Sequence, residues 1–142
     1  MLGQRQDIER VLKKFNMQDA NPTSVPSDLN VKLVKSSDDQ KEEFPYGKAI
    51  GSLLYAAIVS RPDIAYAVGA ASRSIEKPGT EHVAAGTRIM KYSRATSDEG
   101  IVYDTDTELF SYTDADFAQM ETRKSTIGFV FLLNVMVWES QE

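Results

Sequence analysis

The hydrophobic pattern of this chain changes its period near residue 97, and that change limits the folds open to it. Before this point apolar residues recur every three or four positions, which is the spacing of a helix with one buried face. After Gly100 the apolar segments are short, rich in β-branched and aromatic residues and separated by polar breaks, which is typical of strands. The sequence therefore predicts an α+β chain, with an N-terminal helical bundle in residues 1–97 and strands in residues 98–142.

Four helices are predicted in the first part of the chain. Apolar stripes mark the first three, which run over Ile8–Phe15, Tyr46–Ile58 and Ile64–Ile75. Arg61-Pro62-Asp63 has the form of a helix stop followed by a restart, because proline is favoured at the first helical position and aspartate complements the helix dipole. The fourth helix is predicted from Thr80 to about Arg94, after the Pro78-Gly79 break.

Residues 16–45 separate the first two predicted helices and have the composition of a connector. They contain three of the five prolines, which exclude regular helix interiors, and the polar run of residues 36–43. A connector of about 30 residues is long for a compact domain, so we expect it to wrap over the surface of the bundle.

The last part of the chain predicts a meander of three or four strands. Three strands are expected at Ile101–Tyr103, Leu109–Tyr112 and Thr126–Leu133, with a further short one at Val135–Trp138. Val135 disfavours the positive φ that a tight two-residue turn requires, so a tight turn before the last strand is in doubt.

Cysteine is absent from the 142 residues, and this excludes disulfides, zinc–thiolate sites and thiol nucleophiles. Residues 1–15 mix charges throughout and lack the apolar centre of a secretory signal. The longest apolar stretch, Ile127–Trp138, is about half as long as a membrane-spanning helix. We therefore expect an intracellular protein, cytoplasmic or nuclear, that is neither secreted nor inserted in a membrane.

The charges of the chain divide at the same boundary as its hydrophobic pattern. Residues 61–97 contain six basic and three acidic side chains, whereas residues 98–122 contain eight acidic side chains and no Lys or Arg. A basic stretch can follow a phosphate backbone, and a block of acids can bind a divalent cation. Two solvated surfaces of opposite sign explain the same pattern without any ligand.

Four segments, in order and at matching spacing, resemble the C-terminal part of the Pol polyprotein of copia-type LTR retrotransposons. Together they cover almost the whole chain. The segments are Ile8–Met17, Tyr46–Val68, His82–Tyr92 and Tyr112–Phe129, the last of which begins Tyr112-Thr113-Asp114-Ala115-Asp116. The sequence departs from the family pattern at Val83, where the family usually has Trp, at Ser93-Arg94-Ala95, and from Leu133 to Val135.

The resemblance implies that residues 1–97 correspond to the thumb and connection region of a reverse transcriptase, with residues 16–45 as its connector. Residues 98–142 would be the opening strands of an incomplete ribonuclease H-like β-meander. The polymerase acids of the family lie in a Tyr-x-Asp-Asp motif, which this chain does not contain, and the remaining ribonuclease H carboxylates would lie beyond Glu142. We therefore expect a truncated fragment that catalyses neither reaction by itself.

Asp114 is the candidate catalytic and metal-ligating residue, because its position matches the first metal-binding carboxylate of ribonuclease H. Enzymes of this class hold two Mg²⁺ ions between several carboxylates, so one Asp would bind the metal weakly at most, and we expect no tightly bound cofactor. Asp116 is better explained as a surface acid or turn former. Asp104, Asp106 and Glu108 alternate in a predicted hairpin, where a solvated turn is the simpler interpretation.

Arg88, Lys91 and Arg94 recur every three residues on the fourth predicted helix and are the candidate nucleic-acid-binding residues. A plain solvated helix face accounts for them equally without a ligand. His82 is the single histidine, and near a helix start we expect it to pack or to cap the helix rather than to act in catalysis.

Three hypotheses of function follow from these observations. In the first, the chain is a Pol fragment that held an RNA–DNA hybrid and supplied one Mg²⁺ ligand. In the second, it is a host-retained, non-catalytic module that binds nucleic acid or a protein. In the third, it is an autonomous Mg²⁺-dependent nuclease built on Asp114 and Asp116. An unpaired sheet edge beside the apolar run Ile127–Leu133 predicts self-association in addition.

Overall fold

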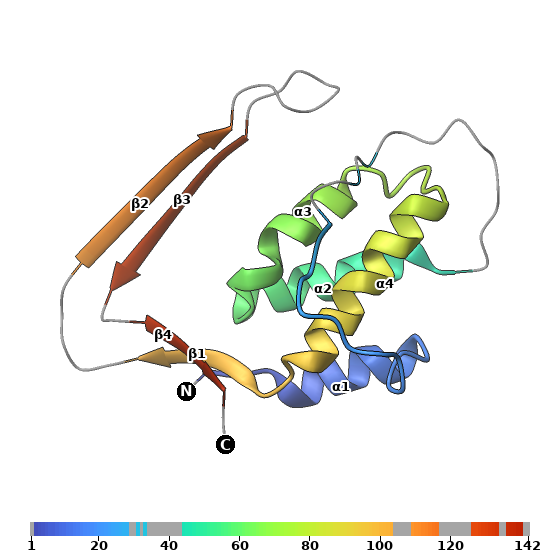
Figure 1. Cartoon of the computed structure of the whole chain (residues 1–142), viewed down its shortest axis with the longest axis horizontal. Helices are drawn as coiled ribbons and strands as arrows, with labels where there is room; N and C mark the ends of the chain where they lie inside the picture. The colour runs from blue at the N-terminus through green and yellow to red at the C-terminus, as the bar shows by residue number, and fades with distance from the viewer. Residues whose placement is uncertain are drawn as a thin grey trace.

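The computed structural model describes residues 2–28, 31, 33, 44–103, 109–116, 126–133 and 136–140. In this part of the chain four α-helices and one 3-10 helix precede four strands (Figure 1). In the described residues the elements change from helices to strands between the end of α4 at Ala95 and the start of β1 at Glu99. The elements are α1 (Arg5–Lys14), α2 (Tyr46–Val59), η1 (Pro62–Ile64), α3 (Ala65–Ser72), α4 (Thr80–Ala95), β1 (Glu99–Tyr103), β2 (Leu109–Asp116), β3 (Thr126–Leu133) and β4 (Met136–Ser140).

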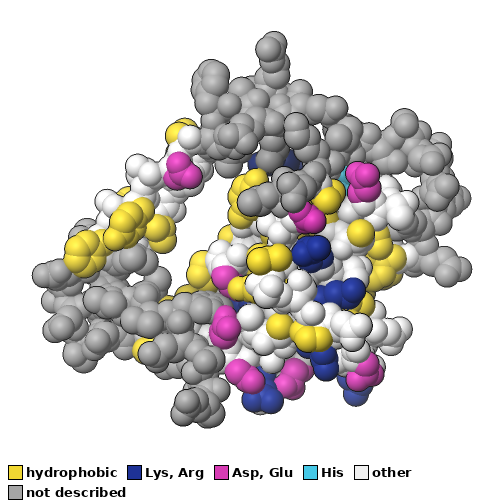
Figure 2. Space-filling view, viewed as in Figure 1, with side chains coloured by type: hydrophobic (Ala, Val, Ile, Leu, Met, Phe, Trp, Pro, Cys, Tyr) yellow, Lys and Arg dark blue, Asp and Glu magenta, His cyan; other side chains and the backbone are white. Residues whose placement is uncertain are grey.

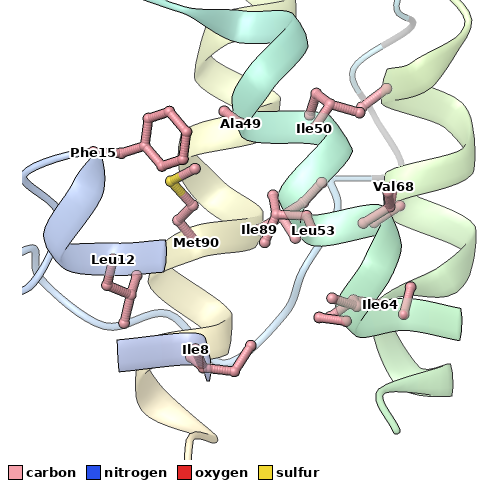
Figure 3. Packing of buried hydrophobic residues seen from close by; sticks show 14 of the residues in the cluster. Ile8, Leu12, Phe15, Ala49, Ile50, Leu53, Ile64, Val68, Ile89 and Met90 are labelled. Carbon is pink, nitrogen blue, oxygen red and sulfur yellow. The ribbon is translucent and has the colours of Figure 1, made fainter. Parts of the chain in front are cut away.

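One apolar cluster holds the helices together. It receives side chains from all four α-helices, and α1 packs against both α2 and α4 (Figure 3). Burial of each such Leu or Ile side chain contributes about 1.5–3 kcal/mol. Among the described helices, none is long and apolar enough to cross a membrane. The centre of the cluster is formed by Ile8, Leu12, Ile50, Leu53, Val68, Ile89 and Met90.

The apolar stripe predicted for the second helix is wrong at Leu54 and Ile58, and the one predicted for the third helix is wrong at Ile75, because these three side chains are exposed. Ile58 is 76% exposed, because at 3.6 residues per turn it lies well off the face that carries Leu53. Small residues, Ala56 and Ala57, are buried in its place. Ile75 is also exposed, because α3 ends at Ser72 and does not reach it.

The described strands form two separate antiparallel pairs. β2 pairs with β3, in the register that places Asp114 opposite Gly128, and β1 pairs with β4. The meander was expected to pair each strand with the next, and in the described strands this holds only for β2 and β3. The turn for which Val135 was expected to be unsuited lies outside the described residues.

Candidate functional site

Asp114 lies in β2 with its carboxylate in solvent. Its Oδ1 accepts a hydrogen bond from the backbone N–H of Ala115 at 2.9 Å. Gly128 faces it on β3, and a Cβ added there would meet no atom within 4 Å. The surface beside the carboxylate is thus open, and the side chain is accessible to a cation from solvent.

The described residues do not fit a complete metal site. No group of three or more His, Cys, Asp or Glu among them is placed to hold a metal ion. A two-metal hydrolytic site needs several carboxylates around ions about 3.5–4 Å apart, and Asp114 offers one. The side chain of Asp116 lies outside the described residues, as do Asp104, Asp106 and Glu108. Asp114 therefore forms no complete metal site with the other described residues.

Two of the three predicted nucleic-acid-binding residues contact the connector. Arg94 donates from Nη1 to the backbone oxygen of Ala20 at 2.7 Å, and Arg88 Nη2 lies 3.8 Å from Asp28 Oδ2. Lys91 is half-buried, and no acidic side chain within the described residues lies within ion-pair distance of it. These two arginines therefore contact the start of the connector from α4.

Charged side chains of both signs are mixed on the helical part of the surface. Figure 2 shows Lys and Arg interspersed with Asp and Glu rather than gathered in one continuous basic patch. Part of this mixing consists of surface pairs on α1, where Arg5 contacts both Glu9 and Asp98 and Arg10 contacts Asp7. On the face shown in Figure 2, a phosphate backbone would therefore meet individual basic side chains, not a wide basic surface.

The densest polar contacts of the described chain surround Arg61, which is 1% exposed. Its Nε and Nη2 donate to the two carboxylate oxygens of Asp63, at 3.0 and 2.8 Å. Nη1 donates to the backbone oxygen of Thr96 at 3.2 Å, and Nη2 donates to Thr96 Oγ1 at 2.5 Å. The guanidinium also lies 5.7 Å from the ring centre of Tyr92. This cluster joins the turn before α3 to the end of α4.

Tyr92 is held neutral by the same surroundings. Burial raises the pKa of its hydroxyl to about 12, and the Asp63 carboxylate adds to the effect through its charge and a hydrogen bond. Arg61 acts in the opposite direction. The cluster is therefore a buried, internally satisfied ion pair with a structural role.

Sequence reasoning missed this cluster. Arg61-Pro62-Asp63 was interpreted as a helix stop and restart, which η1 at Pro62–Ile64 confirms, but arginine is ordinarily a surface residue. One signal could have found it. An arginine and an aspartate lie two residues apart between two apolar helices, and because an unpaired charge is too costly to bury, this spacing favours a buried ion pair.

His82 caps and packs, as the sequence predicted. Its Nδ1 accepts the backbone N–H of Gly79 at 3.1 Å, at the start of α4. Its ring lies edge-on to Tyr46, with centroids 6.3 Å apart, and is 1% exposed. Nε2 has no hydrogen-bond partner among the described residues. Burial lowers the pKa of His82, while the Glu81 carboxylate raises it to a smaller extent.

We expect the unfolding free energy to fall as the pH is lowered below about 6.5. The folded imidazole resists protonation, so the unfolded chain binds more protons and is favoured between the unfolded pKa of 6.5 and the lower folded pKa. Tyr46, with a pKa of about 12, stays neutral in this range. Urea midpoints measured between about pH 5 and 8 test this, with His82→Gln as control, since the chain has no second histidine. Parallel pH profiles for the two proteins would contradict it.

Comparison with curated proteins identifies relatives of nearly the whole chain. It is 40% identical over 151 residues to the Retrovirus-related Pol polyprotein from transposon TNT 1-94 of Nicotiana tabacum, covering 99% of this chain and 11% of that protein. It is 33% identical over 147 residues to the corresponding polyprotein from transposon RE1 of Arabidopsis thaliana, covering 99% and 10%. The chain thus spans about a tenth of the length of these polyproteins.

A third relative is much shorter. The chain is 36% identical over 103 residues to Secreted RxLR effector protein 161 of Plasmopara viticola, covering 69% of this chain and 72% of that protein. No family model and no solved structure matches the chain. The alignments with the two polyproteins cover 99% of this chain, in agreement with the resemblance of the four sequence segments. The chain is therefore homologous to a segment of the retrovirus-related Pol polyproteins of plant transposons.

Proposed function

We propose that this chain is the part of a copia-type Pol polyprotein in which the reverse transcriptase passes into the ribonuclease H domain. Residues 1–97 would form the thumb and connection region, and residues 98–142 the first strands of the ribonuclease H domain. The observation that carries the proposal is the 40% identity to a transposon Pol polyprotein over 99% of the chain. The order of a helical bundle followed by strands is compatible with it.

The role of the chain in this proposal is to hold an RNA–DNA hybrid and to donate one metal ligand. Asp114, exposed on β2, would bind Mg²⁺ once other carboxylates of the polyprotein complete the site. By itself the chain would not cleave the hybrid, because one carboxylate cannot place two metal ions. Of the three candidate residues on α4, Lys91 is the one that would reach a phosphate, since Arg88 and Arg94 contact the connector.

Replacement of Lys91 is the experiment that tests the proposed role. We expect Lys91→Glu to weaken binding of a short RNA–DNA hybrid roughly three- to tenfold, because one phosphate contact becomes a repulsion. The slope of log affinity against log salt should also become about one unit less steep. Fluorescence anisotropy of a labelled hybrid at several salt concentrations measures both quantities.

Lys13→Glu is the matched control, because Lys13 is an exposed lysine on α1 and its replacement changes the net charge equally. A site on α4 predicts a loss for Lys91→Glu and little change for Lys13→Glu. Equal losses would mean that only the overall charge matters. Absence of salt-dependent binding by the unaltered chain would contradict the nucleic-acid role altogether.

A host-retained interaction module is the second candidate function. The effector relative favours it, because this segment makes up most of that protein, so the sequence also occurs outside long polyproteins. A module of this kind need not contact a phosphate backbone. The salt series above separates the two candidate functions. An affinity for the hybrid that does not change with salt concentration, together with binding of a protein partner, would favour the interaction module.

A further inference from the structure

The described start of the connector runs along α4, in the direction opposite to the helix. Ala20 accepts a hydrogen bond from Arg94, near the end of α4. Asp28 lies at Arg88, more than one turn earlier in the helix (Figure 1). We name residues 20–28 the strap. It contains two prolines and no helical residue, so its backbone carbonyl groups are not used within a helix and can accept hydrogen bonds from another element.

The strap and the helix that it contacts differ in charge. Residues 16–28 contain two acidic side chains and no Lys or Arg, whereas α4 contains three basic side chains and one acidic side chain. The basic residues Arg88, Lys91 and Arg94 follow one another at intervals of three, so neighbouring ones lie about 60° apart around the helix. Lys91 is therefore between the two arginines, on the face along which the strap runs.

Each contact of the strap supplies an oxygen atom to an arginine, as a phosphate group would. Arg94 Nη1 donates to the backbone oxygen of Ala20 at 2.7 Å, which is a short hydrogen bond. Arg88 Nη2 and Asp28 Oδ2 lie 3.8 Å apart, beyond the length of about 2.7–2.9 Å that is typical of a charge-assisted hydrogen bond. Both of these side chains are 37% exposed. The contact at Arg88 is thus the weaker of the two, because exposed ion pairs contribute little to stability.

The strap has enough length to leave Arg88 without leaving Arg94. The two arginines are six residues apart, which is about 9 Å along the helix axis. The eight residues from Ala20 to Asp28 can span up to about 26 Å when extended. The strap can therefore release Arg88 while its other contact, at Arg94, keeps it on the bundle.

We propose that the strap is an intramolecular cover of the basic face of α4, in which the Asp28 carboxylate occupies the place of a phosphate on Arg88. A nucleic-acid backbone binds this face by displacing Asp28, while Arg94 remains attached to Ala20. The inference rests on the proposed function, since it requires that nucleic acid binds along α4. It adds that the chain limits its own affinity through the strap.

Phosphate is the better partner for Arg88 once it reaches this face. A guanidinium can form two parallel hydrogen bonds to a phosphate, whereas the nearest oxygen of Asp28 stands beyond hydrogen-bond distance. A phosphate that contacts Lys91 would lie next to Arg88, because the two side chains are neighbours on the helix. Binding at Lys91 thus brings the competing anion to the weaker contact of the strap.

Removal of the Asp28 charge tests the cover. We expect Asp28→Asn to tighten binding of a short RNA–DNA hybrid by the full chain roughly two- to fivefold, the range that corresponds to the loss of an exposed ion pair. Fluorescence anisotropy of the labelled hybrid measures the change. Asp19→Asn is the matched control, because Asp19 is exposed on the same connector and its replacement changes the net charge equally. The control should change the affinity less than Asp28→Asn does.

A second comparison shows whether the gain passes through Arg88. In a chain that already carries Arg88→Gln, Asp28→Asn should have no larger effect than Asp19→Asn, because the arginine that it would release is absent. An equal gain from Asp28→Asn with and without Arg88 would overturn the proposal, as would equal effects of Asp28→Asn and Asp19→Asn in the unaltered chain.

The proposed function and the cover fail in different ways. Hybrid binding that Lys91→Glu weakens, but that Asp28→Asn changes no more than its control, would overturn the cover and leave the proposed function in place. Absence of hybrid binding by both the unaltered chain and Asp28→Asn would overturn the two together.

Spin labelling follows the strap directly. The chain has no cysteine, so a pair of labels can be attached to Ser24→Cys on the strap and Ala84→Cys on α4, both at exposed positions. We expect the distribution of label-to-label distances to broaden towards longer values when the hybrid is added, and also in Asp28→Asn without the hybrid. A distribution that is unchanged in both cases would show that the strap does not move and would overturn the proposal.

Discussion

Arg61→Ala should lower the free energy of unfolding by about 3–5 kcal/mol, the largest effect that we expect of any single replacement in this chain. The loss arises because the partners remain in place without the guanidinium. Asp63 would keep a carboxylate with no cation, and the Thr96 oxygen atoms would lose their donors. Asp63 retains some contact with water, so the lower part of this range is the more appropriate estimate. Urea unfolding followed by helical circular dichroism measures the change.

Arg10→Ala is the matched control for this replacement. Arg10 also forms an ion pair with an aspartate on a neighbouring turn, Asp7, but both side chains are largely in water. Such pairs contribute less than about 1 kcal/mol, so the control should lose little stability. Arg61→Lys keeps the positive charge but loses the planar guanidinium that binds both carboxylate oxygens. Its loss of unfolding free energy should lie between those of the other two variants. Equal, small losses for Arg10→Ala and Arg61→Ala would show that the buried cluster does not stabilise the bundle.

The helices could be predicted from the sequence because their signals are local. The stripe from Ile8 to Phe15 and the Pro78-Gly79 break before α4 depend only on neighbouring residues, and α1 and α4 form where those signals lie. Ile58 was misassigned because α2 is apolar on nearly all sides, so its sequence does not reveal which face is buried.

The contacts that the sequence did not predict join residues far apart in the chain. Arg61 meets Thr96 across 35 positions, and β1 pairs with β4 rather than with β2. A periodicity within a short stretch of sequence cannot predict either of these contacts, because their partners lie outside that stretch. For the candidate site, a strand beginning at Leu109 was predicted, but it was expected to end at Tyr112, whereas β2 continues through Asp114 to Asp116. Asp114 itself was proposed from the family resemblance and not from the strand pattern. The use of Arg88 and Arg94 to hold the connector was not predictable, because it depends on where the connector lies.

Gly100→Ala should detach the N-terminal residues from β1, because there is no room for a side chain at this position. A Cβ built on Gly100 would lie 2.6 Å from the backbone oxygen of Leu2, and a backbone atom cannot rotate away as a side chain can. Leu2 and Ile101 exchange two backbone hydrogen bonds here, of 2.7 and 2.9 Å. Their loss together with the overpacking should cost about 1–3 kcal/mol.

Hydrogen exchange of the Ile101 amide reports this event directly, since that N–H donates to Leu2. We expect its protection to be lost in Gly100→Ala while amides of α2 and α4 stay protected. Gly51→Ala is the control, and we expect it to raise the stability of the chain, whereas Gly100→Ala should lower it. A Cβ on Gly51 would meet nothing within 4 Å, so an alanine inside α2 should stabilise the chain by about 0.4–1 kcal/mol and leave Ile101 protected. Unchanged protection of Ile101 in Gly100→Ala would mean that the backbone of residues 2–3 does not lie against β1.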